Sequence, residues 1–157
     1  MSLVTIQTIL DHTQVDDPDL GRRIVRFGDQ AEASMRRILT YDRGAGVTSF
    51  HLTDQDQGAL YEDIIDYPNS GGQFTEADKD LLTKAETLWA FGEAIPTLGL
   101  RQADDGGFVQ STGFDQSQTN YKRSGELFDF ARDRKSQARA LADSLKPDTQ
   151  RQPVWVL

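Results

Sequence analysis

The chain offers few side chains that could carry out metal or nucleophilic chemistry. Cysteine is absent, which excludes disulfides, thiolate catalysis and cysteine-ligated metal. The two histidines, His12 and His51, lie far apart in the sequence, and neither has a neighbouring histidine with which to form a bidentate metal motif. We therefore interpret both as structural or solvated side chains.

A calcium loop is the nearest metal motif in the sequence. Asp54 and Asp56, followed by Gly58, share part of its pattern. Such a loop needs a bidentate carboxylate at the twelfth position, which is Ile65 here, and the glycine comes one place early. We interpret the segment as an ordinary turn and predict no metal.

Two pairs of carboxylates could in principle support acid–base hydrolysis, Asp63 with Asp66 and Asp104 with Asp105. Such chemistry needs surroundings that separate the two pKa values, and acidic loops are far commoner. The chain has no Gly-x-Ser-x-Gly elbow, no phosphate-binding Gly-x-x-x-x-Gly-Lys loop and no dinucleotide fingerprint. We therefore predict that the protein is not an enzyme and takes no cofactor.

The elements that position these residues are mainly helical. Residues 4–11 have the spacing of a short helix, and Asp17 with Pro18 announces a longer one, with apolar residues at helical spacing over 20–39. Thr75 with Asp78 resembles a capping box before a further helix, which Pro96 and Gly99 should kink or close. Residues 126–145 resume helical spacing. The pattern predicts a small helical bundle.

Strands are expected in two places. Residues 47–53 are β-branched and aromatic and predict a strand, and residues 59–67 could be a short helix or a returning strand. Together they make a β insertion at about 44–72. The polar, glycine-rich region at about 100–120 contains a second predicted strand at 107–112 and is either a hairpin arm or a mobile loop. The fold class expected is mainly α, with residues 1–145 as one domain.

Residues 146–157 are predicted to form an extended docking tail. Pro147 should stop the preceding helix, and Pro153 should present the apolar residues Val154, Trp155, Val156 and Leu157 as an extended strand. Such a strand either binds a partner or folds back onto its own domain.

Charge is distributed unevenly. Residues 1–120 carry 9 basic and 20 acidic side chains, whereas residues 121–157 carry 8 and 5. An acidic body repels phosphate backbones, so sequence-specific binding of nucleic acid is not expected. A basic segment beside an acidic body can pair with copies of itself. The alternative is a solvated helix face formed by Lys122, Arg123, Arg132, Arg134, Lys135 and Arg139.

No membrane attachment is expected from this sequence. No stretch approaches the roughly 20 apolar residues that span a bilayer, and residues 1–10 lack the basic start and long apolar run of a signal peptide. We expect a protein made and used in cytosol.

The order of elements carries a resemblance. Val15-Asp16-Asp17 precedes the long amphipathic stretch at 20–39, a strand-containing insertion follows, then a helix over 81–89 and a trailing arm. This layout resembles that of tailed-bacteriophage head–tail adaptor (connector or neck) proteins. The resemblance implies a ring of copies between the portal of the capsid and the tail, with DNA passing through it, in a virion assembled in the host cytoplasm.

Within such an assembly we hypothesise roles for residues of the apolar tail and of the basic segment. Val154, Trp155, Val156 and Leu157 would dock onto the portal, a tail or neck protein or a neighbouring copy, and Arg132, Arg134 and Arg139 would pair between subunits. Buried aromatic anchors dominate interfaces, so Trp155 should matter most. The rival hypothesis is an acidic regulatory or inhibitory module that binds one basic partner with one-to-one stoichiometry.

Overall fold

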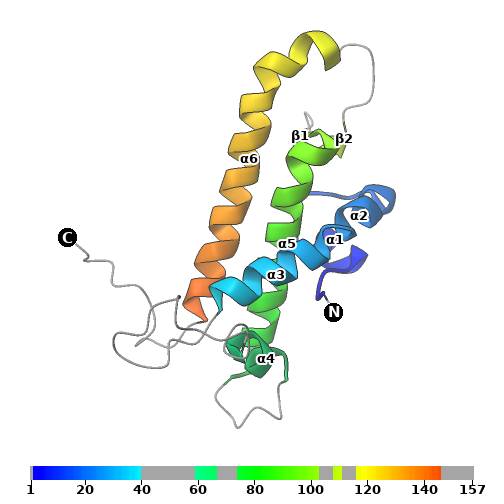
Figure 1. The fold of residues 1–157 in the computed structure, drawn as a ribbon. Helices are drawn as coiled ribbons and strands as arrows, with labels where there is room; N and C mark the ends of the chain where they lie inside the picture. Colours follow the sequence, from blue (N-terminus) through cyan, green and yellow to red (C-terminus); the bar gives the residue numbers. More distant parts are fainter. Residues whose placement is uncertain (1, 40–58, 67–73, 103–107, 111–115, 146–157) are drawn as a thin grey trace, which may run out of the picture.

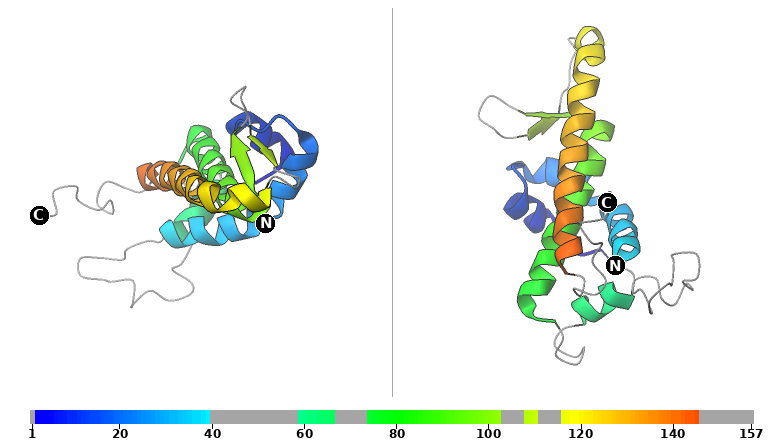
Figure 2. Two further views of the ribbon diagram at one scale, coloured as in Figure 1. Left: turned by 90° about the horizontal axis from the view of Figure 1, so that it is seen from above. Right: turned by 90° about the vertical axis from the view of Figure 1, so that its left-hand side faces the viewer.

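Two long antiparallel helices form the centre of the molecule, α5 (Glu76–Leu98) and α6 (Gln116–Ser144) (Figure 1). The computed structural model describes residues 2–39, 59–66, 74–102, 108–110 and 116–145. The first turns of α6 extend beyond the end of α5. Three shorter helices, α1 (Ile6–His12), α2 (Pro18–Val25) and α3 (Gly28–Ile38), pack against α5. They wrap around it, with α1 and α3 on different sides (Figure 2).

Local caps start α2 and α5, as the sequence predicts. Asp17 accepts a hydrogen bond from the Asp19 amide at 3.0 Å, with Pro18 as the first helical residue of α2. Thr75 and Asp78 form a reciprocal capping box at the start of α5, which confirms that prediction. α5 continues through Pro96, and Gly99 closes it in the left-handed conformation, at φ 63°.

The prediction of one continuous helix over residues 20–39 was wrong. The chain turns at Arg26 and Phe27, where the Phe27 amide donates to the Ile24 carbonyl at 2.9 Å, a contact three residues back. The next helix then starts at Gly28. A Cβ atom on Gly28 would lie 2.6 Å from the Ser2 hydroxyl oxygen and 3.1 Å from the Ser2 Cβ, so any larger residue there would require Ser2 to shift.

The region predicted as a polar loop or hairpin contains the start of α6, ten residues earlier than expected from periodicity. Before it, the short strands β1 (Leu100–Gln102) and β2 (Phe108–Gln110) pair antiparallel, with Leu100 opposite Gln110. Of the predicted β insertion, residues 59–65 form a helix, α4 (Ala59–Ile65), which settles that choice against a returning strand. The predicted strand at 47–53 and the tail at 146–157 lie outside the described residues.

The architecture is mainly α, as predicted, and its core has two parts. The first lies where α1, α2 and the β1 strand meet the second half of α5, and the second lies between α3, α4, α5 and the end of α6. Trp89 packs against both. The largest fully buried side chains are Tyr61, Phe91, Ile9, Ile24, Met35, Leu39, Ile64, Leu82, Ile95 and Leu100.

Candidate functional site: a basic groove between α5 and α6

Of the polar residues that suggested chemistry in the sequence, the structure describes His12, Asp63 and Asp66. His12 lies in the last turn of α1, and Asp63 and Asp66 lie on and just after α4. His51, Asp54, Asp56, Asp104 and Asp105 lie outside the described residues. Among the residues that are described, no group of three or more histidines or carboxylates could hold a metal ion. No described helix is long and apolar enough to cross a membrane.

A groove of about 530 Å³ runs between α5 and α6. Its lining residues come from two helical stripes, because residues three and four apart share one helix face. The α5 stripe consists of Trp89, Glu93 and Pro96, and the α6 stripe of Phe128, Ala131, Arg132, Lys135, Ser136 and Arg139. The groove is therefore a direct product of how the two central helices pack.

Aromatic side chains provide the apolar part of the groove. Trp89 is half-buried between the two core clusters, and its indole nitrogen is buried without a hydrogen-bond partner among the described residues. Phe128, on the facing helix, is 58% exposed. Among the described residues it is the exposed large hydrophobic side chain. An aromatic pair of this kind could hold an apolar side chain of a partner.

Basic side chains surround this apolar part. The Lys135 ammonium lies 2.8 Å from a carboxylate oxygen of Glu93 and 5.4 Å from the centre of the Trp89 ring. Arg132 lies 4.0 Å from Asp129 with both side chains mostly exposed, so that pair contributes little to stability. Arg139 is exposed and makes no ion pair with another described residue. Three cations and one carboxylate give the groove a positive balance in a chain of net charge −8.

The structure brings together two of the three arginines that the sequence singled out. Arg132 and Arg139 both line the groove, whereas Arg134 does not. Arg134 is placed on another face of α6, where it is largely covered and lies 3.0 Å from a carboxylate oxygen of Asp133. The predicted docking residues Val154, Trp155, Val156 and Leu157 lie outside the described residues.

Sequence reasoning missed the aromatic members of the groove. Neither Trp89 nor Phe128 was singled out as a binding residue. The spacing of Phe128, Arg132, Lys135 and Arg139 by three or four residues was the available signal, since it places an aromatic residue and three cations on one face.

A second polar cluster lies in the interior, centred on Glu86 of α5. Its carboxylate is fully buried. One oxygen accepts hydrogen bonds from the Ser2 hydroxyl and the Leu3 amide, both at 2.8 Å, and the other accepts one from the Tyr61 hydroxyl at 2.5 Å. Burial raises the pKa of Glu86, and the hydrogen bonds from Tyr61, Ser2 and Leu3 oppose that rise.

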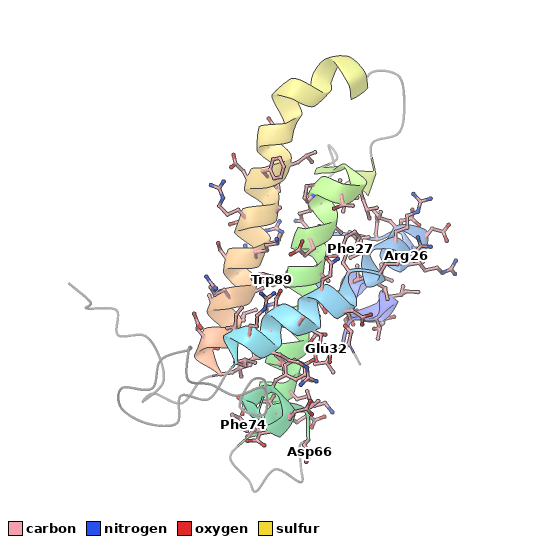
Figure 3. All side chains as sticks on the ribbon, viewed as in Figure 1. Arg26, Phe27, Glu32, Asp66, Phe74 and Trp89 are labelled. Atoms are coloured by element: carbon pink, nitrogen blue, oxygen red, sulfur yellow. The ribbon has the colours of Figure 1, made fainter. Side chains whose placement is uncertain are left out.

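The surroundings of Tyr61 complete this network. Burial, together with the charge of Glu86, raises the pKa of Tyr61, so the phenol stays a neutral donor. The Arg36 guanidinium lies 4.4 Å from the centre of the Tyr61 ring and pairs with Glu32 and Glu62 (Figure 3 labels Glu32). Both oxygens of Glu86 are engaged, and the network joins α5 to α4 and to the N-terminal segment. We interpret it as structural.

The groove is thus the candidate site for binding a partner. It offers aromatic surface and cations. No protein-family model, curated protein or solved structure matches this chain.

Proposed function

We propose that the protein is a structural adaptor that joins other proteins and works without catalysis. The observation that carries this proposal is the groove between α5 and α6, in which exposed Phe128 and half-buried Trp89 are surrounded by Arg132, Lys135 and Arg139. An aromatic centre with a charged rim is the composition of a protein-binding surface.

The proposed class of assembly rests on the resemblance in the layout of the sequence. In this proposal the protein is a head–tail adaptor of a tailed virus, a ring of copies that joins the capsid portal to a tail or neck protein around the DNA conduit. The negative balance of the chain supports it, because acidic surface around a conduit avoids binding to phosphates. The predicted insertion at about 44–72 and the predicted tail at 146–157 belong to the same proposal, with Val154 to Leu157 as a second docking element.

The test is a capture experiment from cells in which the virus assembles. The full-length chain, a double variant Arg132→Glu/Arg139→Glu and a form lacking residues 154–157 are immobilised, and bound proteins are identified by mass spectrometry. Arg134→Glu is the control, since it reverses one arginine of α6 that does not line the groove. We expect portal and tail proteins on the full chain and the control, and their loss from one or both of the other forms.

The rival is an acidic regulatory module, and the net charge of −8 is the observation that favours it. It predicts a single basic partner bound one-to-one through acidic surface. Recovery of one soluble host protein on all four forms would therefore reject the adaptor.

A further inference from the structure

We propose that the groove receives the acidic end of a second copy of this chain. By acidic end we mean the surface formed by α4 and the first turns of α5, with Asp66, Phe74, Glu76 and Asp80. The inference rests on the proposed adaptor function, because it specifies the contact between neighbouring copies in the assembly.

The acidic end has the opposite charge to the groove. Residues 61–66 and 74–80 contain six carboxylates and a single lysine, and Asp66, Glu76 and Asp80 are exposed. Phe74 is half-buried beside them and packs on the second core cluster. Figure 3 shows Phe74 and Asp66 together at the α4 end of the molecule, away from Trp89. The surface therefore offers an apolar side chain within a set of carboxylates.

The groove is the complement of this surface. Three of the four basic side chains in residues 126–145 line it, and none of the four acidic side chains of that segment does. Opposite charges on two surfaces speed their encounter and fix their register, while apolar contacts at the centre contribute the binding free energy. The partly exposed Phe74 is the apolar side chain that would contact Trp89 and Phe128 at the centre of this interface.

One molecule cannot fill its own groove with its own acidic end. Both surfaces are carried by α5, with Glu76 near its start and Glu93 seventeen residues later. At 1.5 Å per residue, they are about 25 Å apart along one continuous helix. The contact must therefore form between copies. Since it joins two different surfaces, it is heterologous and builds a ring if the rotation closes, or a filament if it does not.

Another acidic stretch, at the start of α2, is a poorer partner for the groove. Asp17 there caps the helix, and Asp19 pairs with Arg22 at 3.1 Å. These carboxylates already have local roles.

The test is a charge swap followed by sedimentation velocity at low and physiological salt, with chemical crosslinking at high protein concentration. The groove-reversed variant is Arg132→Glu/Arg139→Glu, and the end-reversed variant is Asp66→Lys/Asp80→Lys. We expect the wild-type chain to self-associate more strongly at low salt. Each reversal should weaken association by about tenfold or more. The chain that carries both reversals should regain it, and Arg134→Glu should behave as wild type.

The rescue keeps the test valid even where one reversal alone harms folding. The inference is overturned if neither single reversal weakens association. It is also overturned if the chain that carries both reversals is folded but does not regain association. A wild-type chain that never crosslinks to itself also overturns the inference. If that chain still captures portal or tail proteins, the adaptor function is retained. Charge-dependent self-association without such capture supports this contact and rejects the adaptor.

Discussion

The buried carboxyl group of Glu86 should make the stability of the fold depend on pH, and Glu86→Gln should remove that dependence. The amide is close to the carboxylate in shape. Its carbonyl can accept from the Ser2 hydroxyl and the Leu3 amide, and its NH₂ group can donate to the Tyr61 hydroxyl, which is able to accept. The substitution therefore tests charge rather than packing.

The sign follows from the direction of the pKa shift. Burial raises the pKa of Glu86 in the folded protein above its ordinary value of 4.5. Between these two pKa values the folded protein keeps a proton that the unfolded chain releases. The contribution of Glu86 to stability is therefore fully present below about pH 4.5. It is lost as the pH rises through the folded-state pKa.

The expected magnitude is about 1.4 kcal/mol in the free energy of unfolding for each pH unit within that window. Other carboxylates add their own dependence to the wild-type curve. The informative quantity is thus the free energy of unfolding of Glu86→Gln minus that of the wild type. It should lie within about 1 kcal/mol of zero at pH 4 and rise with pH.

Tyr61→Phe should act in the opposite direction. It removes the hydrogen bond that opposes the rise in the pKa of Glu86, so that pKa should climb further. The loss of a buried hydrogen bond to a carboxylate should cost about 1.5 to 3 kcal/mol at neutral pH. That cost should shrink in acid.

The assay is urea unfolding followed by far-UV circular dichroism, from pH 4 to pH 8, for the wild type and both variants. Parallel curves for the wild type and Glu86→Gln would refute the reasoning. They would mean that the carboxyl group binds its proton equally in the folded and unfolded states.

Substitutions at two further positions test the packing and capping of α5. Gly92→Ala should lower the free energy of unfolding by about 1 to 3 kcal/mol, although alanine has the better helix propensity. The reason is that its Cβ would lie 2.9 Å from Lys135 Cγ and 3.1 Å from the Ala131 carbonyl oxygen. A urea unfolding midpoint that is unchanged or higher would contradict this prediction. Thr75→Ala should cost about 1 kcal/mol through loss of the capping box, and Thr75→Ser should recover most of it in a thermal melt.

Local features of this fold could be predicted from the sequence, and features set by distant contacts could not. The caps at Asp17 and Thr75 depend on residues two or three positions away, so the sequence contains all of their determinants. The break at Phe27 comes directly before Gly28, which Ser2 approaches closely from a distant part of the sequence. The apolar spacing over 20–39 is the same for one helix or two.

The start of α6 was missed for a different reason. Residues 116–125 contain a single apolar or aromatic side chain, Tyr121, so periodicity had nothing to detect there. A helix without an apolar stripe is visible only in the structure.

The candidate site was predictable in its charge and not in its shape. Arg132 and Arg139 were found from the basic balance of the last segment, and they do share the groove. Arg134 follows Arg132 by two residues, which turns it by about 200° around the helix. Helical geometry alone could have separated it from the other two. Trp89 joined the site only through the packing of α5 on α6.

Some charged side chains of this protein have a clear role in the fold, and others do not. Asp17 and Asp78 cap helices, Glu86 is buried in a hydrogen-bond network, and their presence is explained within one molecule. Arg132 and Arg139 are exposed beside an exposed aromatic ring and do little for the described part of this chain. Exposed residues that do not stabilise the fold indicate a binding surface. We therefore expect the partner to bind at the groove.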